Sequence, residues 1–261
     1  AHIICADEEQ AVQEMSTALD LIEYVADVLG LTQGKEYWYR LSLGDRKNTK
    51  KYFKNDEAWE KGEALMRDML KKRKCDFVEA EDEAAFYGPK IDVQMRNIND
   101  KEDTAFTVQY DFCMPERFDL TYTAPDGNEK RAWVVHRSSI GAIERIMAFL
   151  IEKYAGAFPL WLAPVQVKVL SISEAHKEYA EEVFKTLREH DIRVELDESD
   201  ETLGKKIRNT KLEKVPYFAV IGDKEVENKT ITLESRDGGK SESLSVDDLL
   251  KKLRGEIEEK K

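Results

Sequence analysis

The chain has 261 residues, of which 41% are hydrophobic and 36% are charged, and its formal net charge at neutral pH is −12. This composition is typical of a soluble globular protein and excludes a disordered chain. No apolar run approaches the roughly 20 residues that a membrane-spanning helix needs. Neither half of the chain is basic overall, so a nucleic-acid site would have to be a local patch.

The three cysteines, Cys5, Cys75 and Cys113, are odd in number and never form a CxxC pair. They predict neither a disulfide framework nor a zinc site made of cysteines alone, and they favour a cytoplasmic protein.

The first half of the chain mixes helices with strands. It opens on a strand-like segment without a signal-peptide pattern. Apolar residues at helical spacing predict helices over residues 11–29 and 56–73. Strand patterns follow over residues 76–80, 90–96, 104–112, 117–123 and 131–136, with a hairpin turn at 125–128. Consecutive strands joined by short turns, with helices on either side, indicate an α+β domain built on an antiparallel sheet.

A further helix is predicted over residues 139–155, with Ser138 or Ser139 as its N-cap. The Gly- and Pro-containing segment 156–164 then breaks the pattern, which predicts two domains, 1–158 and 159–261. Beyond the break, strands alternate with helices. The predicted strands are 165–172, 192–196, 217–221 and 229–234, and the predicted helices are 174–189, 203–215 and 246–259. This alternation indicates a small α/β domain with a largely parallel sheet.

Two segments of the first domain carry side chains suited to chemistry. In residues 85–92, a Gly-Pro turn at a strand start would hold Tyr87 and Lys90 at the rim of a sheet, where they suit a small polar substrate with negative charge. An ordinary turn with an exposed lysine explains this segment equally well. In the strand at 104–112, Gln109 and Asp111 share one face, which either lines a site or, more often, meets solvent.

A third segment, residues 136–145, combines a strand, a turn and a helix start. The strand delivers His136, and Gly141 would let a ligand or a neighbouring strand approach the backbone closely. Arg145 could point a planar guanidinium at a nucleotide phosphate or base. A Glu144–Arg145 pair on a helix is usually surface decoration, but the strand–turn–helix setting favours a functional role.

Together these segments resemble the class II aminoacyl-tRNA synthetases, and the bacterial-type threonyl-tRNA synthetase family in particular. Residues 136–145 match that family's third signature motif, and residues 1–5 resemble the tail of its second motif. Residues 161–167 are similar to the family's junction into its anticodon-binding domain, and residues 215–227 resemble a later landmark. The resemblance implies the second half of an antiparallel-sheet catalytic domain followed by a small α/β anticodon-binding domain.

The resemblance also implies an activity. The family forms a threonyl-adenylate from ATP and L-threonine and then transfers threonine to tRNA(Thr). Tyr87 would contact the threonine, and Lys90 would lie near the ligand's carboxylate or phosphate. Gln109 would line the adenylate pocket, and Arg145 would secure the ATP, which is expected to carry Mg²⁺. The implied ATP-binding residues are Gln109, Gly141, Glu144 and Arg145.

The threonyl family holds one zinc ion through one Cys and two His, and the matching histidines are His2 and His136. Zinc accepts neutral imidazole nitrogens, and three protein ligands leave a position open for substrate. Ligation of the threonine hydroxyl would reject valine, which an apolar pocket separates from threonine by only about a hundredfold. The family's Cys ligand is expected upstream of Ala1, as are the first motif and the ATP-binding arginine of the second. The isolated chain is therefore expected to be an inactive fragment of a homodimeric parent.

In the second domain, Glu225 resembles a family residue that accepts hydrogen bonds from an anticodon base. Arg236 lies two residues beyond Glu234, a position where some relatives carry arginine. A predicted helix could present basic side chains to phosphates or simply form a solvated face. These are Lys205, Lys206, Arg208, Lys211 and Lys214.

Two alternatives to a threonine–tRNA ligase remain open. One is a non-catalytic tRNA-binding or regulatory paralogue, and the other is a synthetase for another amino acid, such as proline. Before the strand that carries Gln109, Asp103-Thr104 stands where many bacterial relatives have Trp-Gln. The contact that the Trp-Gln pair makes in those relatives is therefore not expected here. Joint retention of the two histidines with Tyr87, Lys90 and Arg145 favours the threonine–tRNA ligase hypothesis.

Overall fold

The structure is a computed structural model and describes residues 1–260. These residues form two compact units, one spanning Ala1–Phe149 and the other beginning at Leu150. The division lies inside helix α4 (Ile143–Tyr154), and the boundary predicted after residue 158 lies just beyond the end of that helix.

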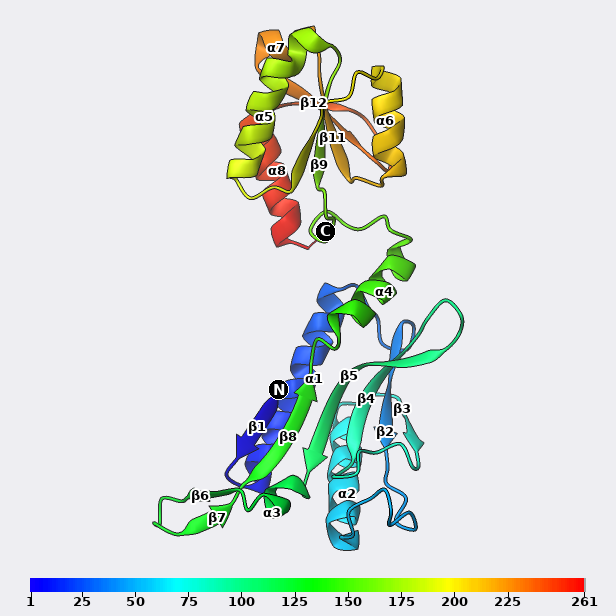
Figure 1. Ribbon diagram of the computed structural model, residues 1–261, viewed down its shortest axis with the longest axis vertical. Coiled ribbons are helices and arrows are strands. Elements are labelled where there is room, and N and C mark those ends of the chain that lie inside the picture. Colours follow the sequence, from blue (N-terminus) through cyan, green and yellow to red (C-terminus); the bar gives the residue numbers. More distant parts are fainter. Residues whose placement is uncertain (261) are drawn as a thin grey trace. The chain divides into compact units, whose positions relative to one another are not determined.

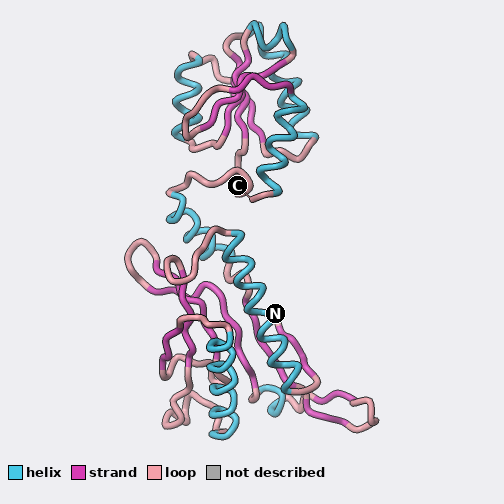
Figure 2. Tube along the Cα trace, turned by 180° about the vertical axis from the view of Figure 1, so that it is seen from behind, coloured by secondary structure: helices cyan, strands magenta, loops and turns pink. Residues whose placement is uncertain are grey.

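The first unit is a six-stranded sheet with two long helices, α1 (Glu8–Val28) and α2 (Asp56–Lys72), on one face (Figures 1 and 2). Neighbouring strands are antiparallel except for the last pair, which is parallel. In spatial order the strands are β1 (His2–Cys5), β8 (Trp133–Ser138), β5 (Glu102–Asp111), β4 (Lys90–Arg96), β2 (Tyr37–Ser42) and β3 (Phe77–Ala80). Outside this sheet lie α3 (Met114–Arg117) and the hairpin β6 (Thr121–Thr123) and β7 (Glu129–Arg131).

Alternation along the strands separates an apolar face from a polar one. Val108, Ile91 and Leu41 are fully buried on the face that α1 and α2 cover. Helix α1 begins where Asp7 accepts a hydrogen bond from the backbone of Gln10 at 2.8 Å. Its inner face carries apolar side chains at helical spacing, namely Met15, Ala18, Leu19, Ile22 and Ala26. The opposite, polar face of the sheet is therefore free to form a site.

Most of the elements expected in this unit are present, with three differences. Strand β2 was not predicted, and of the strand expected over residues 117–123 only Thr121–Thr123 forms, because the chain first makes the short helix α3. Helix α4 begins at Ile143 rather than near 139, since Gly141 has φ of +74° and lies outside helical geometry. Neither Ser138 nor Ser139 is therefore its N-cap.

The second unit is a five-stranded sheet between helices, with α6 (Leu203–Leu212) on one face and α5 (Lys177–Glu189) and α8 (Val246–Glu258) on the other (Figure 1). The strand order is β10 (Val194–Asp197), β9 (Val167–Ser171), β11 (Tyr217–Ile221), β12 (Thr230–Ser235) and β13 (Glu242–Ser245). The first three strands pair in parallel, whereas β12 pairs antiparallel with both of its neighbours, β11 and β13. The expected parallel sheet is therefore half right, and β13 and the short helices η1 (Glu174–His176) and α7 (Asp223–Asn228) were not predicted separately.

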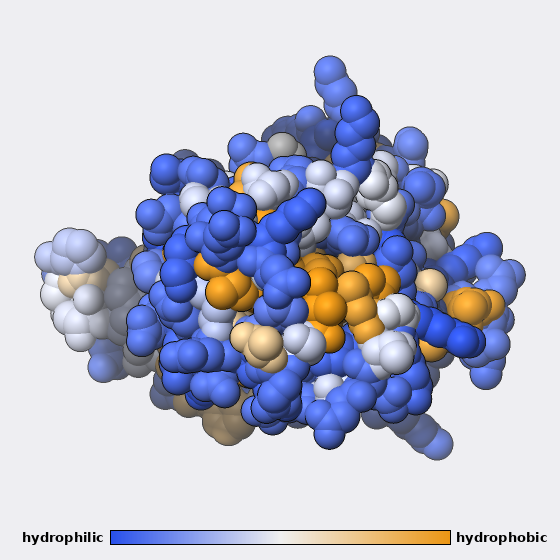
Figure 3. All heavy atoms as spheres, turned by 90° about the horizontal axis from the view of Figure 1, so that it is seen from above, coloured by the Kyte–Doolittle hydropathy of each residue, from blue (hydrophilic) through white to orange (hydrophobic). Residues whose placement is uncertain are grey.

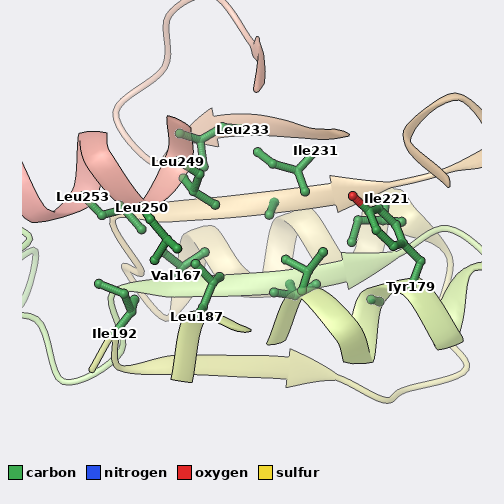
Figure 4. Close-up of a cluster of buried hydrophobic side chains, with 14 of the residues drawn as sticks. Val167, Tyr179, Leu187, Ile192, Ile221, Ile231, Leu233, Leu249, Leu250 and Leu253 are labelled. Atoms are coloured by element: carbon green, nitrogen blue, oxygen red, sulfur yellow. The ribbon is translucent and has the colours of Figure 1, made fainter. Parts of the chain in front are cut away.

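The core of the second unit lies under α5 and α8. Figure 4 shows Val167, Leu187, Ile221 and Leu249 packed between these helices and the sheet. The surface seen in Figure 3 is mostly hydrophilic, with a small apolar area near its centre. Across residues 1–260, no helix has both the length and the apolar character needed to cross a membrane.

Side-chain hydrogen bonds hold the segment that leads into β9, residues 160–166. The Arg193 guanidinium donates to the carbonyls of Ala163 and Trp161 at 2.8 and 2.7 Å. The buried Gln166 amide donates to the carbonyl of Leu160 at 3.0 Å. This segment is thus ordered by Gln166 and Arg193, which directly precede strands β9 and β10.

Candidate active site and tRNA-binding surface

The strand register places five polar side chains in one row across the first sheet. His2 lies opposite His136, which lies opposite Gln109, and Gln109 lies opposite Lys90, which lies opposite Ser42. Directly opposite residues of antiparallel strands project from the same face. The row therefore runs over the face that α1 and α2 leave uncovered and brings together residues far apart in sequence.

The two histidines contact each other, and a buried carboxylate orients one of them. Their ring centroids are 4.5 Å apart in a T-shaped arrangement. Nε2 of His136 lies 2.7 Å from Oδ2 of the fully buried Asp111, whose Oδ1 accepts the backbone N–H groups of Cys113 and Met114 at 2.9 and 2.8 Å. Because a carboxylate only accepts, this contact favours the tautomer of the neutral imidazole in which Nε2 donates and the lone pair lies on Nδ1. A histidine held this way by a carboxylate is typical of metal ligands.

The cysteines of this chain do not complete a three-ligand group. Cys5 is buried and projects from β1 to the face opposite His2, since adjacent residues of a strand alternate. Cys113 is also buried, at the start of α3. Within residues 1–260 no cluster of three or more His, Cys, Asp or Glu side chains could hold a metal ion. The predicted pair, His2 and His136, is thus brought together without a third ligand beside it.

Tyr87 lies against His136, one of the two paired histidines. Its ring stacks on that of His136 with centroids 4.8 Å apart, and its hydroxyl donates to Oε1 of Gln109. Burial raises the pKa of the Tyr87 phenol above its ordinary value, and the carboxylates of Asp111 and Asp92 raise it further. The phenol therefore stays protonated at neutral pH and acts as a hydrogen-bond donor to Gln109.

Lys90 is ordered by a buried aspartate that sequence reasoning did not single out. The Lys90 ammonium lies 2.9 Å from Oδ2 of Asp92, which is fully buried. The same oxygen accepts from Ser42 at 2.8 Å and from the Arg40 guanidinium at 3.2 Å. Both of these partners lie on the unpredicted strand β2. The aromatic run Tyr37-Trp38-Tyr39, followed by the alternation of Arg40, Leu41 and Ser42, was the signal that could have revealed it.

Gly141 and Arg145 both lie against strand β5. A Cβ at Gly141 would stand 2.1 Å from the carbonyl oxygen of Ala105, so this glycine permits close approach of a strand. The Arg145 guanidinium donates to the carbonyl of Thr104, and Glu144 is exposed beside it. Of the two explanations offered for Gly141, the structure supports the neighbouring strand.

In the second unit, Glu225 is held at both oxygens. It accepts from the backbone N–H of Gly222 at 2.9 Å and from the Thr232 hydroxyl at 2.8 Å. Partial burial alone would raise the pKa of Glu225, but these hydrogen bonds outweigh it and hold the pKa below its ordinary value. The side chain is therefore a fixed, ionised acceptor at neutral pH.

The basic residues predicted to meet tRNA occupy different environments. Lys205 and Arg208 are exposed on α6, and Lys205 pairs with Glu201 at 2.6 Å. Lys206 is buried and donates to the Ser171 carbonyl at 3.2 Å, which removes it from any phosphate-contacting face.

Arg236 is engaged within the second unit. Its guanidinium pairs with both carboxylate oxygens of Asp237 at 2.9 Å and donates to the carbonyls of Phe158 and Lys214 at 3.1 and 3.0 Å. To contact RNA, this side chain would have to give up some of these bonds or offer its remaining donor.

Comparison with known proteins assigns both units. Residues 1–154 match the family model of the tRNA synthetase class II core domain (G, H, P, S and T), and residues 166–256 match that of the anticodon binding domain. Because the core model covers more than half of the chain, the chain belongs to the class II tRNA synthetase family. The fold class expected from the sequence is confirmed.

The particular relatives are threonine–tRNA ligases. The chain is 46% identical over 256 residues to the enzyme of Clostridium perfringens, a match covering 98% of the chain and 39% of that protein. For the Oceanobacillus iheyensis enzyme the identity is 44% over 262 residues, covering 100% and 40%. A solved structure described as the RNA binding domain of threonyl-tRNA synthetase from Cryptosporidium parvum superposes with a TM-score of 0.89 at 34% identity, covering 97% of this chain and 62% of that one. The resemblance to threonyl-tRNA synthetases is thus confirmed, and the chain spans about two fifths of the length of these curated relatives.

Proposed function

We propose that this chain is part of an ATP-dependent threonine–tRNA ligase. The polar face of the first unit forms threonyl-adenylate, and the second unit binds the anticodon of tRNA(Thr). One observation supports this most strongly. The paired His2 and His136, with Asp111 fixing the His136 tautomer, lie in one row with Gln109 and Lys90. The enzyme acts in the cytoplasm as a homodimer of the full-length protein.

His2 and His136 supply two ligands of a zinc ion, and a cysteine outside this chain supplies the third. The donor set fits, since both ligands are imidazoles and Asp111 leaves Nδ1 of His136 free to bind a metal. When bound, zinc would ligate the amino and hydroxyl groups of threonine and thereby distinguish it from valine. The hydroxyl-bearing side chain is the feature that the site selects.

Adenylate formation is an in-line attack on phosphorus, in which positioning and charge neutralisation dominate. Lys90, ordered by Asp92, supplies a fixed positive charge beside the carboxylate and the phosphates. Tyr87 and Gln109 orient the amino acid and the adenylate. ATP binds with Mg²⁺. The motif that secures it contains Gly141, Glu144 and Arg145.

The second unit selects the tRNA. Glu225, held at fixed orientation by Gly222 and Thr232, accepts hydrogen bonds from an anticodon base. Lys205 and Arg208 on α6 contact phosphates, and Arg236 contributes from the end of β12.

The decisive experiment uses the full-length protein with His136→Ala. We expect loss of bound zinc, measured by elemental analysis, together with loss of threonine-dependent pyrophosphate exchange. His190→Ala, an equivalent substitution in the second unit, is the matched control and should retain both. Full activity in a metal-free preparation would refute the zinc assignment. Tight tRNA binding without any threonine-dependent exchange in the wild type would favour the non-catalytic paralogue.

A further inference from the structure

Three consecutive hydrogen bonds link four side chains of the polar face. The Tyr87 hydroxyl donates to Oε1 of Gln109. Nε2 of Gln109 donates to Oγ1 of Thr107 at 3.3 Å, and the Thr107 hydroxyl donates to Oδ1 of Asp92 at 2.9 Å. The chain of bonds thus starts at the ring stacked on His136 and ends at a fully buried carboxylate on β4.

The buried end sets the direction of every bond in this chain. A carboxylate only accepts hydrogen bonds, and the cations Lys90 and Arg40 beside Oδ2 balance its charge. Thr107 must therefore give its single proton to Asp92 and accept from Gln109. The Gln109 amide then turns its NH₂ group toward Thr107 and its oxygen toward the Tyr87 hydroxyl.

We propose that Asp92 and Thr107 are positioning residues that fix the orientation of the Gln109 amide and the Tyr87 hydroxyl. The role in catalysis rests on the function proposed above. Because the only proton of the Tyr87 hydroxyl is used within the chain of bonds, its oxygen presents lone pairs to the site. A substrate group that meets this oxygen must be a donor, such as an N–H of the amino group of an amino acid.

Loss of the Thr107 hydroxyl would release this constraint. The Gln109 amide could then turn over and place its NH₂ group against Tyr87, whose hydroxyl would have to point its proton into the site. A proton pointing outward opposes a donor on the amino acid. Binding of ATP would be affected less than binding of the amino acid, because of these two groups only Gln109 is also assigned to the nucleotide. Buried hydrogen-bond networks have large effects on orientation when one member is left unpaired.

The test compares Thr107→Val, which removes the hydroxyl at nearly constant shape, with Thr107→Ser, which keeps it. Both are made in the full-length protein, and pyrophosphate exchange is measured while threonine and ATP are varied separately. We expect Thr107→Val to raise the KM for threonine about tenfold, the effect of about one hydrogen bond, and to raise the KM for ATP by much less. Thr107→Ser should behave like the wild type. If Thr107→Val is unstable, Thr107→Ala removes the same hydroxyl and carries the same expectation.

Unchanged KM for threonine in Thr107→Val would overturn the proposal. An equal rise in both KM values, or a rise in Thr107→Ser as large as that in Thr107→Val, would also overturn it, because either would indicate a general disturbance of the site. A wild-type protein without threonine-dependent exchange would instead refute the proposed function, so the two failures can be told apart.

Discussion

Asp111→Asn is expected to change the tautomer of His136, because it replaces the acceptor oxygen that faces Nε2 by an NH₂ group. Asp111 makes three hydrogen bonds, two from backbone N–H groups to Oδ1 and one from Nε2 of His136 to Oδ2 at 2.7 Å. An asparagine keeps the shape and can keep its oxygen toward the backbone donors. Its NH₂ group then faces Nε2 of His136, so that two donors meet. The imidazole relieves this by moving its proton to Nδ1, the nitrogen that would otherwise bind a metal.

The expected cost is a weakening of zinc binding by about 10- to 100-fold, which corresponds to about 1.4–2.7 kcal/mol. Competition with a chelator measures the affinity, and threonine-dependent pyrophosphate exchange measures the consequence for activity. Asp126→Asn at the exposed hairpin tip is the matched control and should change neither. Zinc affinity equal to that of the wild type in Asp111→Asn, with unchanged stability, would refute the role given to Asp111.

Three further predictions concern the turn before α4 and Glu225 in the second unit. Gly141→Ala should destabilise the protein by more than about 2 kcal/mol, because Cβ would meet the Ala105 carbonyl; Gly127→Ala, with a similar positive φ and open space around it, should cost only about 1 kcal/mol in thermal unfolding. Glu225→Gln should weaken charging of tRNA much more than adenylate formation, and equal loss in both steps would contradict an anticodon role. Because the pKa of Glu225 is lowered on folding, its ionised hydrogen bond with Thr232 stabilises the fold above the ordinary carboxyl pKa, and this contribution is lost as pH falls through the lowered value. Acid unfolding of Glu225→Gln should lack this part of the pH dependence.

The sequence predicted well those elements whose pattern is local. The strand expected over residues 90–96 forms with the same bounds, and α1, α2 and α5 lie close to their expected ranges. Each depends on the spacing of its own apolar residues. The start of helix α4 differs from the prediction because Gly141 packs closely against the backbone of Ala105 on strand β5. No local sequence pattern contains this contact.

The sequence predicted which residues belong to the candidate site but not how they are arranged in space. Lys90, Gln109 and His136 could be singled out by residue type and by resemblance, and their strands β4, β5 and β8 neighbour one another in chain order. His2 joins the row because β1, the first strand of the chain, pairs with β8, which no local pattern predicts. For the same reason, Asp111 could be taken for a solvent-facing residue. It is in fact buried against His136. This partner lies on strand β8, which α3 and the β6–β7 hairpin separate from β5 along the chain.

The hydrogen bonds to the segment before β9 determine where the chain can be cut to give a separate second unit. Arg193 and Gln166 both donate to carbonyls in residues 160–163, and Arg236 donates to Phe158. A piece beginning at residue 166, where the match to the anticodon-binding family begins, would lose all of these acceptors and leave the NH₂ group of the buried Gln166 without its partner. A piece that begins before Phe158 would carry its own acceptors with it, so the autonomous folding unit extends upstream of the recognisable family sequence.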